Sequence, residues 1–217
     1  MMWLFPKRKK EPLFIHKRKS TLKQLQKAFP KVLAEDVQAV WDSFRSTQEA
    51  DIMELVFFFD NTTDWLLPSG DCVTLPYRIL FCEQLRKGVE LTERQEVIWH
   101  CIGSRSLDGY ARQRHIEALL AIDLPEWALP YIIKICDEYV TEILHVVYAS
   151  LSQHDCTAYK RVCALNLEYI KLGHSRMISY WNEFYRWDCY RYQDYVGKKL
   201  YRECFGYSKT GQKYIRF

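Results

Sequence analysis

Residues 127–151, WALPYIIKICDEYVTEILHVVYASL, decide the fold class of this chain. Their apolar residues recur every three or four positions, which is the spacing of one face of an α-helix and not the alternation of a strand. The acidic pair Asp137-Glu138 interrupts the pattern once, and aspartate is a residue type that caps helix starts. The stretch therefore predicts the end of a helix that begins at Pro125, followed by a second helix capped by Asp137.

The same periodicity extends in both directions, from Ser20 to Gly206. Residues 34–45 carry apolar positions at helical spacing, and residues 51–59 are apolar nearly all round, which predicts a central, fully covered helix. About ten short helices with tight links describe an all-α protein. Further helix starts are predicted at Pro76, Thr92, Asp108, Asp155, Ser175 and Asp194, and helix ends at Gly173 and Gly206.

One segment departs from the helical pattern. Pro68-Ser69-Gly70-Asp71 has the composition of a turn and lies between two short apolar runs. We expect a small hairpin or an irregular loop over residues 65–75. Whether this segment blocks a site or builds one stays open at this point.

Three short phrases around a central tyrosine recur at offsets of 29 and 56 residues, near one and two units of a helical-hairpin repeat. The phrases are Asp108-Gly-Tyr-Ala-Arg112, Asp137-Glu-Tyr-Val-Thr141 and Gln193-Asp-Tyr-Val-Gly197.

Together with Ala128-Leu129-Pro130 between the first two phrases, residues 103–151 resemble a HEAT-like repeat. In such repeats the last position of this phrase, just after the valine, is usually an arginine. Arg112 fits this pattern, whereas Thr141 and Gly197 depart from it. The resemblance implies a right-handed superhelix of antiparallel helical hairpins, an α-α solenoid whose second helices line a concave face. Residues 101–120 are also similar to uncharacterised small bacterial proteins, which implies no activity.

Charge is distributed unevenly along the chain, with basic ends and an acidic middle. The net charge is +6 over residues 1–19, −5 over 20–108, −2 over 109–172 and +5 over 173–217, which together give the overall +4. We expect a basic flexible arm over 1–19, a single α-helical repeat-like domain over 20–206 and a basic C-terminal tail over 207–217. The arm is either a contact for phosphate or acidic protein or a solubilising tail.

The apolar runs and the cysteines indicate the cellular compartment in which the protein is expected. No run reaches the ~20 apolar residues of a membrane span, and the basic cluster Lys7–Lys10 follows the apolar start instead of preceding it as in a secretory signal. The eight cysteines form no Cys-x-x-Cys pair and fall mostly in apolar helical patterns. We therefore expect a reduced, cytoplasmic protein with no membrane association and no cofactor. His145, His154, Cys156 and Cys163 lack zinc-site spacing, so no metal site is predicted.

One cluster with possible chemistry follows Asp108. Arg112 or Arg114 could bind a phosphate or carboxylate, with His115 as an acid or base. Alternatively Asp108 caps the helix, Arg112 pairs locally and His115 is partly buried. The second interpretation is favoured.

A second cluster, residues 180–192, holds seven aromatic residues interleaved with Arg186 and Arg191. Aromatic rings with cations are typical of single-stranded nucleic-acid binding. However, Tyr180, Phe184 and Trp187 share one helical face, which favours a heavily packed core helix. The basic residues that remain as an exposed binding surface on the last two helices are Arg186, Arg191, Lys198, Lys199 and Arg202.

The sequence contains no phosphate-binding glycine loop, metalloprotease motif, nucleophile elbow or paired-carboxylate motif. This absence, with the repeat-like pattern, predicts a non-catalytic helical scaffold that binds a protein partner through a concave surface. One alternative is a nucleic-acid-binding protein that uses the basic and aromatic C-terminal helices. Another is an enzyme that resembles the HEAT-like alkylpurine DNA glycosylases, for which Trp99, Trp127, Trp181, Trp187 and Asp188 are suitable residue types.

Overall fold

The computed structural model describes residues 21–43, 61–79 and 89–208. The predicted arm over 1–19, the predicted helix over 51–59 and most of the predicted C-terminal tail lie outside the described residues. Within them the protein is mostly helical, as predicted, with one small antiparallel sheet. Residues 21–26 form a further helical turn ahead of the named elements.

The elements have the following bounds. The α-helices are α2 (Ala34–Ser43), α3 (Glu93–Gly103), α4 (Gly109–Leu120), α5 (Leu129–Ile135), α6 (Thr141–Leu151), α7 (Thr157–Leu165), α8 (Leu167–Tyr180) and α9 (Val196–Glu203). The shorter turns are η1 (Lys31–Leu33), η4 (Glu126–Ala128), the π-helical η5 (Trp181–Tyr185) and η6 (Tyr192–Asp194). The strands are β1 (Thr62–Leu66) and β2 (Cys72–Pro76).

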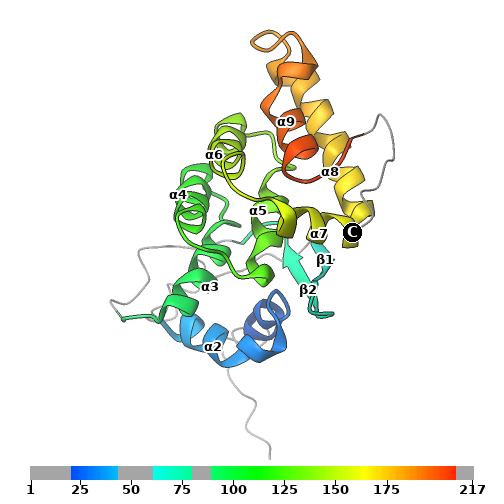
Figure 1. Ribbon diagram of the computed structural model, residues 1–217. Helices are drawn as coiled ribbons and strands as arrows, with labels where there is room; N and C mark the ends of the chain where they lie inside the picture. The colour runs from blue at the N-terminus through cyan, green and yellow to red at the C-terminus, as the bar shows by residue number, and fades with distance from the viewer. Residues whose placement is uncertain (1–20, 44–60, 80–88, 209–217) are drawn as a thin grey trace, which may run out of the picture.

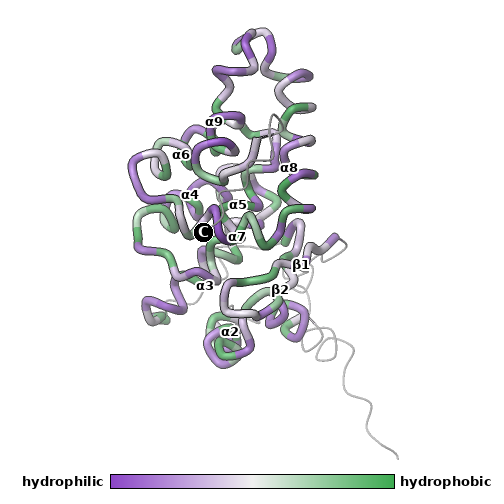
Figure 2. The backbone as a smooth tube through the Cα atoms, turned by 45° about the vertical axis from the view of Figure 1, so that its right-hand side comes forward, coloured by the Kyte–Doolittle hydropathy of each residue, from purple (hydrophilic) through white to green (hydrophobic). Residues whose placement is uncertain are grey.

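The helices pack in succession along the molecule. α2 packs on α3, α3 on α4, α4 on α6 and α6 on α9, and this series runs upward through Figure 1. α5 lies in the middle and packs against α7. α8 projects beyond the other helices, and the loop after it forms the upper end of the molecule in Figures 1 and 2.

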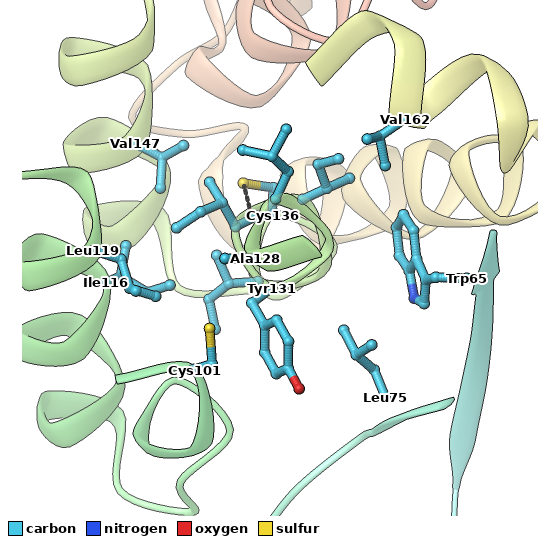
Figure 3. Close-up of a cluster of buried hydrophobic side chains, with 14 of the residues drawn as sticks. Trp65, Leu75, Cys101, Ile116, Leu119, Ala128, Tyr131, Cys136, Val147 and Val162 are labelled. Atoms are coloured by element: carbon cyan, nitrogen blue, oxygen red, sulfur yellow. Dashed lines mark hydrogen bonds between the residues drawn. The ribbon is translucent and has the colours of Figure 1, made fainter. Parts of the chain in front are cut away.

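The core is built around α5, in which every residue is buried. A helix that is apolar nearly all round is stable only when neighbours cover all of its faces. Each fully buried Leu or Ile side chain contributes about 1.5–3 kcal/mol to the free energy of unfolding. Figure 3 shows the side chains that surround α5, among them Ile116 and Leu119 from α4, Val147 from α6, Val162 from α7 and Trp65 from β1.

The predicted hairpin is confirmed and is slightly longer than expected. β1 and β2 pair antiparallel with Trp65 opposite Val73, and both of these side chains are fully buried. In the turn, the backbone N–H of Gly70 donates to the carbonyl of Leu67 at 2.9 Å, and Gly70 has a φ of +90°, which glycine adopts without strain. The hairpin therefore covers the core and is not a free loop.

Several predicted helix boundaries are confirmed. Thr92 and Gln95 form the predicted capping box of α3, with hydrogen bonds of 3.3 and 3.1 Å. Asp108 caps α4 by accepting from the backbone N–H of Tyr110 at 3.0 Å. Gly206, with a φ of +70°, follows the end of α9. These signals depend on residues within one helical turn of each other.

Other predicted boundaries are wrong. Pro76 ends β2 and does not start a helix, and Asp137 does not cap α6, whose N-cap is Val140. Gly173 and Ser175 lie inside α8, so neither ends nor starts a helix. The last helix begins at Val196 after the N-cap Tyr195, one residue beyond Asp194.

The helix predicted from Asp155 is divided in two. Asp155 does accept a hydrogen bond from the backbone N–H of Thr157 at 2.9 Å, at the start of α7. However, α7 ends at Leu165, because Asn166 leaves the helical conformation with φ −119° and ψ 37°. The Asn166 side chain is instead used in a contact with β1, so a tertiary interaction sets this break.

Candidate functional site

The most exposed aromatic side chain of the described residues, that of Trp187, lies just after the end of α8, with two further exposed rings beside it in sequence. We call residues 181–191, which comprise η5 and the loop after it, the α8 tip. Trp187 is 92 % exposed, Tyr190 75 % and Phe184 55 %. The expectation that Phe184 and Trp187 pack in a helical core is therefore wrong, because α8 runs beyond the helices that could cover this face.

The α8 tip has a defined shape. The indole N–H of Trp181 donates to the carbonyl of Cys189 at 2.8 Å and closes the loop. The Tyr185 hydroxyl donates to the carbonyl of Tyr139, just before α6, and its ring stacks on Tyr195 with centroids 6.1 Å apart. These contacts hold the exposed rings in place before any partner binds, which lowers the entropy lost on binding.

The charge of the α8 tip is mixed. Arg186 and Arg191 are exposed there, and the Arg186 guanidinium donates to the Asn182 side chain at 3.2 Å. The same segment contains Glu183 and Asp188, both exposed. The two predicted cations are therefore placed beside exposed aromatic rings, but without a local excess of positive charge.

A second group of predicted residues lines a small pocket. Lys198 and Arg202 of α9 face a pocket of about 110 Å³ whose lining includes His174, Tyr192 and Tyr207. Lys198 Nζ lies 4.8 Å from the centroid of the Tyr192 ring, and the guanidinium of Arg202 pairs with Glu203. Lys199 lies half-buried on the same helix.

The remaining two predicted binding residues lie on α4 and differ in exposure. Arg114 is exposed, whereas Arg112 is only 4 % exposed. Arg112 Nη1 donates to the carbonyls of Ser106 and Leu107 at 3.0 Å, and its Nε lies 3.2 Å from a carboxylate oxygen of Glu138. Arg112 is thus an interior ion-pairing residue and not part of an open surface.

His115 of the same cluster is also buried. Its Nδ1 lies 2.9 Å from Nδ1 of His100, so one of the two rings donates a hydrogen bond to the other, and its ring packs edge-on against Trp99. A Cβ on Gly103 would come within 2.2 Å of the His115 ring, so the imidazole is enclosed on that side as well. His115 is part of the packed interface between α3 and α4.

The structure reveals a buried group that the sequence analysis missed. Glu138 is surrounded by the guanidinium groups of Arg78, Arg105 and Arg112. Arg78 binds it with two hydrogen bonds of 2.7 Å each, and Arg105 donates at 3.0 Å. The partners are 60, 33 and 26 positions away along the chain, so no local spacing could have signalled the group. The only hint is the acidic pair Asp137-Glu138 inside an otherwise apolar stretch.

The aromatic and acidic residues of the glycosylase alternative are divided between two places: Trp181 lies on the α8 tip with Trp187 and Asp188, whereas Trp99 and Trp127 lie outside it. Trp99 is buried in α3, whereas Trp187 and Asp188 lie on the α8 tip, at the other end of the succession of helices (Figure 1). Across residues 21–43, 61–79 and 89–208, no group of three or more His, Cys, Asp or Glu side chains could hold a metal ion. Within those same ranges, no helix has the length and apolarity that a membrane crossing requires.

The seven cysteines in the described part of the chain are free thiols, and five of them are buried. Burial raises the pKa of the Cys101, Cys136 and Cys163 thiols well above its usual value, so these groups are inert packing residues and not nucleophiles.

Searches for relatives found no matching family model, no matching curated protein and no matching solved structure.

Proposed function

We propose that this chain is a non-catalytic helical binding protein that docks a protein partner on the α8 tip. The observation that carries the proposal is the exposure of three aromatic side chains, Phe184, Trp187 and Tyr190, on one projecting and internally hydrogen-bonded segment. Tryptophan and tyrosine dominate the binding energy of protein interfaces when a partner buries them. Leaving such rings in water has no benefit for folding, so their placement supports a role in binding.

Charge favours a protein partner over nucleic acid. The α8 tip carries Arg186 and Arg191 against Glu183 and Asp188, so it is neutral overall. Nucleic-acid binding depends on neutralising phosphates and requires a net positive surface. Mixed charges around aromatic anchors are instead typical of the rim of a protein–protein interface.

The repeat-like architecture is part of the same proposal. The succession of α3, α4, α6 and α9 supports HEAT-like stacking of hairpins, in which each helix covers the apolar face of its neighbour. We place the partner on the tip and not on a concave face, because three exposed aromatic residues, Phe184, Trp187 and Tyr190, lie within this one short segment.

Site-specific crosslinking tests the proposal. A photoreactive amino acid replaces Tyr190 on the tip or, as a matched control, Tyr110 on α4, which is 79 % exposed but far from the tip. In native extract we expect one predominant protein adduct from position 190 that is absent from position 110. The same adduct should disappear when Trp187→Ala is added.

The captured partner is then purified and titrated with the chain. Trp187→Ala should weaken binding by at least about thirtyfold, the effect of losing a central aromatic anchor, while Tyr110→Ala should leave it unchanged. Equal binding by the Trp187→Ala chain would disprove docking on the tip.

Nucleic-acid binding remains the second candidate, because Trp187 and Tyr190 are exposed next to Arg186 and Arg191. A fluorescence titration with single- and double-stranded oligonucleotides decides it. Binding that falls steeply with salt and is lost in the Arg186→Gln/Arg191→Gln chain would support it. Binding that is absent in dilute salt, or insensitive to salt, would dismiss it.

A further inference from the structure

A buried charge cluster lies between α4, α5, α8 and the links that precede α3 and α4. Asp137 and Glu138 are its two acidic members, and their side chains are 1 % and 2 % exposed. Glu138 pairs with three arginines, as described above. Asp137 accepts hydrogen bonds from Lys134 Nζ at 3.2 Å and Arg176 Nη1 at 3.0 Å, and from the Tyr169 hydroxyl.

The cluster has more cations than anions. The five cationic side chains Arg78, Arg105, Arg112, Lys134 and Arg176 share two carboxylates, which leaves three positive charges without a counter-charge among the described residues. Arg105, Arg112 and Lys134 have side chains that are 4 % exposed or less. Burying a cation without a counter-charge costs several kcal/mol. Among the described residues, the positive charge of this cluster is therefore not balanced.

The Nη1 atom of Arg105 marks one position in the cluster where a hydrogen-bond acceptor would fit. Arg105 is fully buried, and its Nη1 has no hydrogen-bond partner among the residues that the structure describes. The rest of its guanidinium is used: Nε donates to the carbonyl of Pro76 at 3.3 Å, and Nη2 donates to the carbonyl of Tyr77 at 2.5 Å and to Glu138. An orphaned arginine nitrogen inside a protein is rare and calls for an acceptor.

The cluster reaches solvent around Tyr77. The Tyr77 ring is 39 % exposed, with the Arg78 guanidinium 4.4 Å and Lys134 Nζ 5.0 Å from its centroid. Arg176, whose side chain is 41 % exposed, is the most open cation of the cluster. Arg176 and Arg78, whose side chains are 41 % and 13 % exposed, are therefore the cations of the cluster that a small ligand would contact first.

We propose that this cluster is a binding site for a tetrahedral oxyanion, a phosphate or the phosphate group of a larger ligand. Arginine guanidinium groups bind phosphate with paired hydrogen bonds, and lysine adds a point charge. A dianion neutralises two of the three excess charges, whereas a carboxylate neutralises one. The site uses none of the residues of the α8 tip, so it stands or falls independently of the proposed docking.

Two cations of the cluster have lowered pKa values. Burial lowers the pKa of Lys134 to about 8, although Asp137 acts to raise it. Burial likewise lowers the pKa of Arg112, against the opposing effect of Glu138. A bound oxyanion would return both pKa values toward their ordinary range.

Thermal unfolding in defined anions tests the site. The full chain is melted in sodium phosphate, sodium sulfate or sodium acetate, with ionic strength held constant by sodium chloride. We expect phosphate and sulfate to raise Tm in a saturable way and acetate to match chloride. A Tm that does not respond to phosphate would overturn the proposal.

A variant pair separates the site from a general effect of salt. Arg176→Gln removes the most open cation of the cluster, and we expect it to weaken phosphate affinity by at least about tenfold. Arg161→Gln removes an exposed arginine of α7 that pairs with Glu126, outside the cluster, and should leave affinity unchanged. Equal phosphate affinity in both variants would show non-specific ion binding and would also overturn the proposal.

Discussion

At the scale of single residues, the interior of this protein depends on the pair Asp137-Glu138. The two neighbours bind different cations: Asp137 contacts Lys134 and Arg176, whereas Glu138 contacts arginines from α4 and from the links before α3 and α4. Ion pairs taken out of water are strongly interdependent, because losing one member leaves the others buried and uncompensated. The pair therefore ties α5 and α8 to the segment after the hairpin.

Glu138→Gln tests this dependence. The amide keeps the shape but leaves three arginines without their shared carboxylate, so we expect the free energy of unfolding to fall by about 3–5 kcal/mol. Urea denaturation measures it. The matched control is Glu168→Gln, because Glu168 is 87 % exposed and pairs with Lys171 on the surface, where the loss should be about 0.5 kcal/mol or less. Similar losses in both variants would refute the central role of Glu138.

At the scale of elements, two glycines set the close approach of α8 and α9. A Cβ on Gly173 of α8 would lie 2.6 Å from the Tyr201 hydroxyl, and a Cβ on Gly197 of α9 would lie 2.8 Å from the Met177 side chain. Both distances are too short for an ordinary contact. Gly173 therefore serves packing inside a helix and not helix termination.

Gly173→Ala should destabilise the protein by about 1–3 kcal/mol, because the strain of the close contact exceeds the gain in helix propensity. Tyr201→Phe removes the oxygen that the new methyl group would meet. We expect the double variant to recover part of the loss, beyond the sum of the single effects, in urea denaturation. Additive effects would place the strain elsewhere, since Asp137 Cβ lies 3.2 Å away on the same side.

The Asn166 side chain binds the edge of the hairpin with the pair of hydrogen bonds that a neighbouring strand would otherwise make. The backbone N–H of Leu66 donates to Asn166 Oδ1 at 2.8 Å, and Asn166 Nδ2 donates to the carbonyl of Leu66 at 2.9 Å. This reciprocal pair continues the ladder from β1 to the junction of α7 and α8. The ring of Trp65 packs on Tyr169 of α8, with centroids 4.5 Å apart, and joins the same elements.

Asn166→Asp keeps the acceptor and the shape but removes the donor, so the carbonyl of Leu66 loses its partner. We expect a loss of about 1–2 kcal/mol and faster amide hydrogen exchange over residues 62–76. Exchange in α3 and α4 should stay as in the unaltered chain. Unchanged exchange in the hairpin would show that Trp65 and its packing hold it without Asn166.

At the scale of the whole molecule, local signals predicted the helical class and the caps at Thr92 and Asp108, because each involves neighbours in sequence. The role of Asp137 was missed because its partner Arg176 is distant along the chain. The aromatic face of α8 was also misread. Periodicity predicts that Trp187 shares a helical face with Tyr180 and Phe184, but η5 ends at Tyr185 and Trp187 lies exposed in the turn that follows.

The response to pH is also a property of the whole core. Burial raises the pKa values of the thiols of Cys101, Cys136 and Cys163 and of the phenols of Tyr131 and Tyr201. Above about pH 9 for the thiols and about pH 10 for the phenols, the unfolded chain releases these protons while the folded chain keeps them. The folded state then binds more protons, so stability falls as pH rises. Each such group contributes about 1.4 kcal/mol per pH unit.

We expect urea denaturation between pH 7 and 10.5 to show a loss of stability that steepens above about pH 9. Cys101→Ala removes one buried thiol and should reduce the slope between pH 9 and 10 by about one proton, whatever its effect on stability at pH 7. Cys72→Ala, which removes an exposed thiol of β2, is the matched control and should leave the slope as it is.

Lys134 has the opposite effect on the alkaline loss of stability. Because burial lowers its pKa to about 8 in the folded chain, the unfolded chain keeps the Lys134 proton above this pH while the folded chain loses it, and stability rises with pH. Lys134→Met should therefore steepen the alkaline loss, and a shallower loss in that variant would contradict the burial of a charged lysine beside Asp137.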